Sequence, residues 1–226
     1  MMKNIYVVAN WKSNMTMAQG LDWISKVGPN IPKTEELKVI VCPALSSVSE
    51  ILKTIKVGGF PIMVGSQDIS PFGVGAYTGE ESASLVKDLV EFSIIGHSER
   101  RQNFFESDEM VSRKVNQASE QGITPIFCVQ GSDTPVPEIC TLVAYEPVFA
   151  IGTGNPDTPE SADKVAKMLK DLYKSEMEVL YGGSVTAENV KSFIVEENIN
   201  GVLVGKASLN ADEFIAIIKE CMSEAN

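Results

Sequence analysis

The chain has 226 residues, 44% of them hydrophobic and 22% charged, which is an ordinary balance for a globular protein with a sizeable core. Its formal net charge of −11 argues against nucleic acid and anionic membrane surfaces as partners. The longest apolar runs fall far short of the roughly 18 residues that a membrane-spanning helix needs. No signal-peptide cleavage pattern follows the N-terminal string "MMKNIYVVAN".

Four cysteines bear on the redox compartment and on metal binding. None of them belongs to a CxxC pair or has the spacing of metal ligands. We therefore expect reduced thiols in a cytoplasmic protein, and no metal site. The cysteines are Cys42, Cys128, Cys140 and Cys221.

Eight short apolar runs, several of them bounded by glycine, are typical of parallel strands that are buried on both faces. They lie at residues 5–10, 38–42, 61–66, 92–96, 124–129, 141–146, 178–183 and 201–206. Amphipathic helical patterns separate most of them, at residues 16–27, 46–56, 80–91, 107–121, 158–174, 186–197 and 210–222. The strings "TPES" and "TAEN" predict helix N-caps at Thr158 and Thr186.

The alternation of eight strands with helices in a chain of this length favours an α/β fold, a closed (β/α)₈ barrel, over an open doubly wound sheet. The connection between the fifth and sixth strands is the exception. Residues 130–140 contain two prolines, which predicts a shortened or missing helix and an extended covering segment. No linker, repeat or low-complexity segment interrupts the chain, so we expect a single domain over residues 1–226.

Polar residues and glycine-rich turns follow several of the predicted strands. Asn10 and Lys12 follow the first strand, His97 follows the fourth, and Glu146 ends the sixth. Glycine-rich turns follow the last three strands. Barrel enzymes place their chemistry at the carboxyl ends of the strands, so these residues should converge on one rim. A lone histidine beside an apolar run is more often a packed core residue, but this convergence favours a functional one.

Five strings resemble triosephosphate isomerases, in order and at matching spacing across most of the chain. They are "NWKSN", "GHSERR", "AYEPVFAIGTG", "YGGSV" and "GVLVGKASL". The resemblance implies a TIM barrel enzyme that interconverts D-glyceraldehyde 3-phosphate and dihydroxyacetone phosphate through an enediolate. It also implies a small phosphorylated triose as substrate and no cofactor or metal.

The resemblance implies catalytic roles for five residues. Glu146 matches the base that moves a proton between adjacent carbons, and His97 matches a neutral electrophile. This family is itself the known example of an imidazole whose pKa is lowered by a helix N-terminus, and "HSERR" can open such a helix. Lys12 would stabilise the negative charge of phosphate and enediolate, while Asn10 and Glu99 match the partners that hold this lysine. Asn10 would also donate a hydrogen bond near the substrate oxygen.

Phosphate binding and a lid are implied as well. The positions that match phosphate-contacting backbone groups are Gly152, Ser184, Gly205 and Lys206, the last standing where the family usually has glycine. The matching lid would exclude water and keep the enediolate from losing phosphate. It consists of Pro147, Val148, Phe149, Ala150, Ile151, Gly152, Thr153 and Gly154. Phe149 replaces the usual tryptophan, and "NPD" (155–157) replaces the usual far hinge.

The segment "SPFGVGAYTGE" (70–80) matches a protruding loop that docks into a neighbouring subunit. The alternative interpretation is a mobile surface loop, but the glycine and aromatic content of the segment, together with this match, favours a dimer. The match implies a homodimer in which Thr78 approaches the neighbour's active site and Glu80 reaches the neighbour's Arg100. The shortened fifth crossover resembles compact archaeal members, some of which are tetramers, so a tetramer stays open.

Two other functions remain open at this stage. One is a Schiff-base aldolase on a phosphate-binding barrel, with Lys12 as the nucleophile. The other is a binding module that keeps the fold and has lost the reaction. The presence of Asn10, Lys12, His97 and Glu146 together argues against the second.

Overall fold

The computed structural model describes residues 3–223 and contains a closed barrel of parallel strands in the order β1 to β8. The predicted (β/α)₈ fold is therefore confirmed. Residues 1–2 and 224–226 of the expected domain lie outside the described residues. The strands are β1 (Ile5–Asn10), β2 (Leu37–Cys42), β3 (Met63–Ser66), β4 (Phe92–Ile95), β5 (Thr124–Val129), β6 (Leu142–Tyr145), β7 (Glu178–Tyr181) and β8 (Gly201–Val204).

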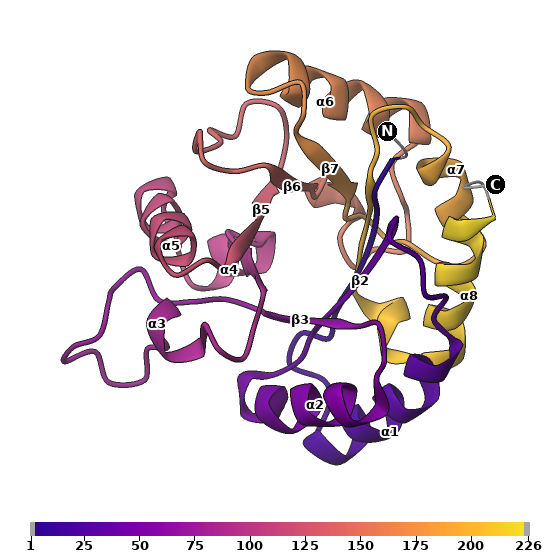
Figure 1. The fold of residues 1–226 in the computed structure, drawn as a ribbon. Helices are drawn as coiled ribbons and strands as arrows, with labels where there is room; N and C mark the ends of the chain where they lie inside the picture. Colours follow the sequence, from indigo (N-terminus) through magenta and orange to yellow (C-terminus); the bar gives the residue numbers. More distant parts are fainter. Residues whose placement is uncertain (1–2, 224–226) are drawn as a thin grey trace.

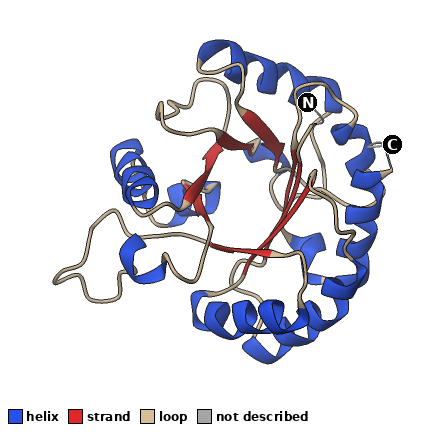
Figure 2. Ribbon diagram, in the orientation of Figure 1, coloured by secondary structure: helices blue, strands red, loops and turns tan. Residues whose placement is uncertain are grey.

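Helices surround the barrel, as Figures 1 and 2 show. The α-helices are α1 (Met17–Val27), α2 (Leu45–Gly58), α3 (Ala83–Val86), α4 (Ser98–Asn103), α5 (Asp108–Glu120), α6 (Pro159–Leu172), α7 (Val190–Ile194) and α8 (Ala211–Met222). Three short 3₁₀ helices accompany them, η1 (Gly28–Asn30), η2 (Val148–Ala150) and η3 (Lys206–Leu209).

Alternate residues along the strands divide the core into two layers. Val8, Ile40 and Ile126 belong to the cluster inside the barrel, and all three are fully buried. Their neighbours along the strands, such as Val7 and Val39, belong to the larger cluster between the barrel and the helices. Because both faces of each strand are covered, the strands need the continuous apolar runs that the sequence shows.

Two helices are shorter than the sequence predicts. The helix expected over 80–91 is limited to α3, because residues 73–81 form an exposed loop and turns follow at 87–89. The helix expected over 186–197 is limited to α7. The side chain of Asn189 accepts the Thr186 N–H (2.9 Å) and holds a turn there, so the predicted cap at Thr186 is wrong. The predicted cap at Thr158 is correct, since its side chain accepts the Ser161 N–H.

The connection between β5 and β6 follows the outside of the barrel without forming a helix over residues 130–141, and Figure 2 shows it as a loop. Val136 and Cys140 are its buried anchors. The Val136 N–H also donates to the Tyr173 hydroxyl (3.2 Å), at the carboxyl end of α6. The segment therefore covers the barrel through two apolar side chains and a contact with the next helix.

The loop between β3 and α3 extends away from the barrel (Figure 1). Its base is closed by the Ser70 N–H, which donates to the Glu81 carbonyl at 2.8 Å. Within it the rings of Phe72 and Tyr77 stack with centroids 4.4 Å apart. Thr78 lies in its exposed part. We call residues 70–80 the arm.

Candidate active site

The carboxyl ends of three strands bring three buried polar side chains to one rim of the barrel. Asn10 ends β1, His97 follows β4, and Glu146 follows β6. Their exposed fractions are 5%, 5% and 2%, which is low for polar residues and requires that each be hydrogen-bonded. The convergence expected from the sequence is therefore present in the structure.

His97 is the N-cap of α4, and this position fixes its ring. Its Nδ1 accepts the backbone N–H of Glu99 at 3.2 Å. A nitrogen that accepts a hydrogen bond carries no proton in the neutral ring, so the geometry assigns the ring proton to Nε2. Nε2 lies 3.0 Å from Oε1 of Glu146.

Glu146 is held by the same helix end. Its second oxygen, Oε2, accepts the Ser98 N–H at 3.0 Å. Gly182, just beyond β7, leaves room for this side chain, because a Cβ there would lie 3.0 Å from the Glu146 Cγ. Burial raises the pKa of Glu146, but its interactions with His97 and the Ser98 N–H lower that pKa by more, so the net direction is downward.

The pKa of His97 differs from the sequence-based expectation. Burial lowers the pKa of His97, but the adjacent Glu146 carboxylate raises it by more, so the net direction is upward. The predicted lowering is therefore wrong for this arrangement. The helix N-terminus is where the sequence predicts it, but the contact between the two catalytic candidates could not be read from their spacing.

Lys12 has a strained backbone and several partners. Its φ is 51°, in the left-handed region that residues other than glycine rarely adopt. Its Nζ lies 2.6 Å from Oε1 of Glu99, as the sequence predicts, and its N–H donates to Asn10 Oδ1 at 3.0 Å. Gln67 Nε2 donates to the carbonyls of Lys12 (2.8 Å) and Cys42 (2.9 Å). These contacts hold the strained backbone of Lys12 in place.

Gln67 is a site residue that the sequence reasoning missed. It directly follows β3, at the same rim as the other candidates. The rule that polar residues after barrel strands belong to the site would have found it.

The candidate phosphate positions lie beside Lys12 and the lid. A Cβ at Gly205 would lie 3.6 Å from the Lys12 Nζ, so the turn after β8 passes close to the ammonium group. Lys206 begins η3 and is not among the residues with positive φ, so its side chain is accommodated without left-handed strain. Ser184 has a φ of 51°, while Gly152 has a φ of 69° and lies in the exposed part of the lid.

The lid, residues 147–154, contacts the turn after β7. The Ser184 hydroxyl donates to the Ala150 carbonyl at 2.5 Å and accepts the Gly154 N–H at 3.2 Å. Ala150 is fully buried, whereas the side chains of Val148 and Phe149 are exposed. The lid is thus fixed at Ala150 and presents two large apolar side chains to solvent.

A buried ion cluster lies behind the site, and the sequence reasoning did not predict it as a unit. Lys114, 2% exposed, places Nζ 2.6 Å from Asp68 Oδ2 and 2.5 Å from Glu106 Oε1. Arg100 contacts the same two carboxylates, at 2.9 and 2.6 Å. Burial raises the pKa of Asp68 to about 6 despite the neighbouring cations. The predicted contact of Arg100 with a neighbour's Glu80 stays a prediction, and Arg100 already has partners within its own chain.

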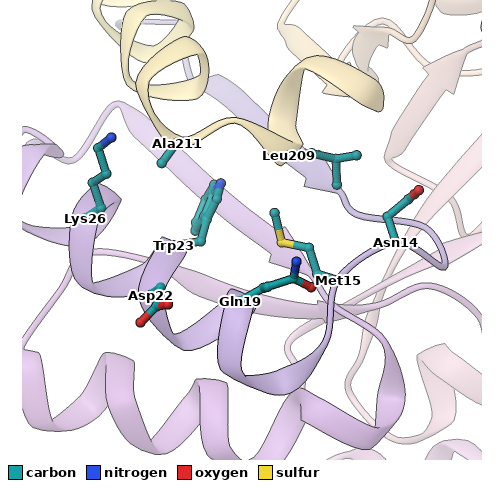
Figure 3. Close-up of a pocket in the computed structure, with 8 residues that line it drawn as sticks. All are labelled: Asn14, Met15, Gln19, Asp22, Trp23, Lys26, Leu209 and Ala211. Atoms are coloured by element: carbon teal, nitrogen blue, oxygen red, sulfur yellow. The ribbon is translucent and has the colours of Figure 1, made fainter.

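A cavity of about 510 Å³ lies away from the residues described above, and Figure 3 shows its lining. It opens between α1 and the segment that joins η3 to α8. Its lining residues are Asn14, Met15, Gln19, Asp22, Trp23, Lys26, Leu209 and Ala211. None of the predicted catalytic residues lines it.

None of the helices within residues 3–223 has the length and apolarity that a membrane span requires. The same residues hold no group of three or more His, Cys, Asp or Glu side chains placed to bind a metal ion.

Comparison with known proteins identifies the family. A family model described as triosephosphate isomerase matches residues 5–221. The chain belongs to the triosephosphate isomerase family. It is 35% identical to the triosephosphate isomerase of Alkaliphilus oremlandii over 249 residues, and the alignment covers 96% of this chain and 99% of that protein.

Two further relatives show the same extent of similarity. The triosephosphate isomerase of Thermus thermophilus is 33% identical over 253 residues. That of Mesomycoplasma hyopneumoniae is 35% identical over 243 residues. In both cases the alignment covers 96% of this chain and 99% of the relative.

The raised pKa of His97 yields a prediction for the Glu146→Gln variant. Glutamine keeps the shape of the side chain and removes the charge that raises the pKa, while burial and Lys12 continue to lower it. We expect the imidazole to titrate at a lower pH in the variant than in the parent. Side-chain ¹⁵N chemical shifts measure this without assignment, because His97 is the only histidine.

A Glu109→Gln variant is the control, since Glu109 pairs with Arg113 on the exposed face of α5. Its histidine titration should match that of the parent. An unchanged or higher midpoint in Glu146→Gln would show that Glu146 does not set the protonation of His97.

Proposed function

We propose that this chain is a triosephosphate isomerase that interconverts D-glyceraldehyde 3-phosphate and dihydroxyacetone phosphate within a single barrel domain. The observation that carries the proposal is the arrangement at the amino end of α4. There Glu146, His97 and Lys12 each contact one of the first residues of one helix. Membership of the family and near-complete alignment with its named members support the same reaction.

In this mechanism Glu146 is the base. It removes a proton from one carbon of the substrate and returns it to the adjacent carbon, so no cofactor takes part. Burial by itself makes this carboxylate more basic, but its contacts with His97 and the Ser98 N–H lower its pKa in the structure, so it gains basicity for abstraction from carbon as it leaves the His97 ring. Both of its oxygens are hydrogen-bonded in the structure. Glu146 must therefore release a partner before it reacts.

His97 and Lys12 stabilise the oxygens of the enediolate. Nε2–H of His97 is the donor, and it becomes available when Glu146 turns from the ring to the substrate. Because Nδ1 is occupied by the Glu99 N–H, the ring keeps one orientation during this exchange. Lys12 supplies a positive charge, and Asn10 helps to hold the Lys12 backbone in place.

The phosphate group is bound by backbone N–H groups at Gly152, Ser184, Gly205 and Lys206, with the lid closing over it. The proximity of the Gly205 turn to the Lys12 ammonium group supports this assignment. So does the Ser184 hydroxyl, which already links the lid to the turn after β7.

The functional unit in this proposal is a cytoplasmic homodimer. The arm supports the dimer, because it extends from the barrel and carries Thr78 and Glu80 in an exposed position. Its stacked aromatic pair stiffens a segment whose residues 73–80 are exposed on the single chain. The four cysteines are free and buried, which supports a reducing compartment.

The aldolase alternative is weakened by the surroundings of Lys12. A Schiff-base lysine must reach the substrate carbonyl with a free amine, whereas Lys12 Nζ is held 2.6 Å from the Glu99 carboxylate. Borohydride treatment in the presence of a triose phosphate separates the two reactions. An isomerase forms no imine and is not trapped.

The assignment of Glu146 predicts the kinetics of the Glu146→Gln variant. We expect kcat to fall by about 10²–10⁴-fold with a modest change in KM, because the amide keeps the shape but cannot accept the proton. The measurement is a coupled isomerase assay in both directions, with Glu188→Gln as an exposed control. A variant that keeps more than about a tenth of the parent rate would refute the role of Glu146.

The role of the arm predicts a link between assembly and rate. Deleting residues 71–76 should yield a more monomeric protein with a sharply lower kcat, because the neighbour's Lys12 and His97 lose packing that positions them. Light scattering, the isomerase assay and circular dichroism measure assembly, rate and folding on one sample. A folded monomer with full activity would show that each barrel works alone.

A further inference from the structure

Asp157 lies at the far end of the lid, and its carboxylate links β6 to α6. The mechanism above gives it no role. Asp157 ends the "NPD" string and is half-buried. Its Oδ2 accepts hydrogen bonds from the Tyr145 hydroxyl (3.2 Å) and the Ser161 hydroxyl (3.1 Å), and its Oδ1 accepts the Thr158 N–H (2.8 Å). One side chain is thus bound to β6 on one side and to the first turn of α6 on the other.

The β6 side of this network is rigid. Tyr145 is 5% exposed, and its backbone pairs in register with Tyr181 of β7. The Tyr181 ring stacks on Phe193 with centroids 4.0 Å apart, and its hydroxyl accepts the Asp157 N–H at 2.7 Å. Burial and the nearby Asp157 carboxylate both raise the pKa of Tyr145, so its hydroxyl keeps the proton that it donates.

The position of this link in the chain relates it to the reaction. Tyr145 and Asp157 are 12 positions apart, and the base and the whole lid lie between them. The hydrogen bond therefore brings the far end of the lid back to the residue that precedes Glu146. Tying the far end of the lid to the strand that also carries its near end restricts the conformations open to the lid.

We propose that Asp157 is a positioning residue for the reaction, because its carboxylate ties the far end of the lid to Tyr145 and so sets how the lid closes over Glu146. This inference rests on the proposed isomerase function and assigns a further residue to it. If the lid closes loosely, the enediolate loses its phosphate. The bond between carbon 3 and the phosphate oxygen breaks and its electron pair leaves with inorganic phosphate, while the electrons of the enediolate form a double bond between carbons 2 and 3, which leaves the enol of a 2-oxoaldehyde.

The test measures inorganic phosphate released per isomerisation turnover, in Tyr145→Phe and Asp157→Ala. Each variant removes the link from one side. We expect the ratio to rise about tenfold in either variant, the size of effect that a lost hydrogen bond to a charged group produces. Partial unfolding would lower isomerisation and phosphate release together, so it would leave the ratio unchanged.

Two further variants test whether the effect comes from the hydrogen bond between Tyr145 and Asp157. In Tyr145→Phe/Asp157→Ala the ratio should rise no further than in Asp157→Ala alone, because both changes break the same interaction. Ser161→Ala removes a donor to the same oxygen from the α6 side only, so its ratio should stay at the parent value.

An unchanged ratio in Tyr145→Phe would overturn the proposal, as would a double variant in which the two effects multiply. Tyr145→Phe removes one oxygen and keeps the packed ring, so it carries the test alone if Asp157→Ala does not fold. A parent protein without isomerase activity would refute the proposed function. An active parent with insensitive variants would refute only the role of Asp157.

Discussion

The candidate site depends on the hydrogen bonds that the amino end of α4 donates. The first N–H groups of a helix have no partners within the helix, and the helix dipole makes that end locally positive. Here the N–H of Ser98 binds the Glu146 carboxylate, and the N–H of Glu99 binds the His97 ring. The Glu99 side chain then holds the ammonium group of Lys12. One helical turn therefore orients three side chains that come from β1, β4 and β6.

This arrangement also explains how an acidic chain can hold an anionic substrate. The formal net charge is −11, so the whole molecule repels anions at long range. Screening by salt limits that repulsion to about 8 Å at physiological ionic strength. At the candidate phosphate position, however, the Lys12 ammonium group lies beside the Gly205 turn and supplies a local positive charge. At that position the nearby positive charge of Lys12 outweighs the long-range repulsion by the net charge of the molecule.

Much of this account could be read from the sequence, because parallel strands buried on both faces leave an unambiguous apolar pattern. The barrel, the missing fifth crossover helix and the rim positions of Asn10, His97 and Glu146 follow from that pattern. The lengths of α3 and α7 did not, because the exposed loop before α3 and the turn held by the Asn189 side chain replace helix there.

Other features depend on contacts that spacing does not encode. The pKa of His97 depends on a carboxylate that lies two strands further along the chain, and Gln67 reaches a carbonyl 55 positions away. The "NPD" string was visible as a departure from the family pattern. Its link to Tyr145 depends on the three-dimensional fold, because the partner lies on the opposite side of the lid.

The pH dependence of a Ser98→Pro variant tests the central role of the helix end most directly. Ser98 is the first residue of α4, where proline is well tolerated, and the ψ of 139° at His97 suits a residue that precedes proline. The substitution removes the N–H that binds Glu146. Ser98→Ala is the matched control, because the Ser98 hydroxyl is buried without a hydrogen-bond partner among residues 3–223.

The Ser98 N–H lowers the pKa of Glu146, so its removal must raise that pKa. The acid limb of kcat/KM, which reports the free enzyme, should therefore lie at higher pH in Ser98→Pro than in Ser98→Ala. Acid limbs that coincide in two folded, active variants would contradict the account, since the amino end of α4 would then not control the protonation of Glu146.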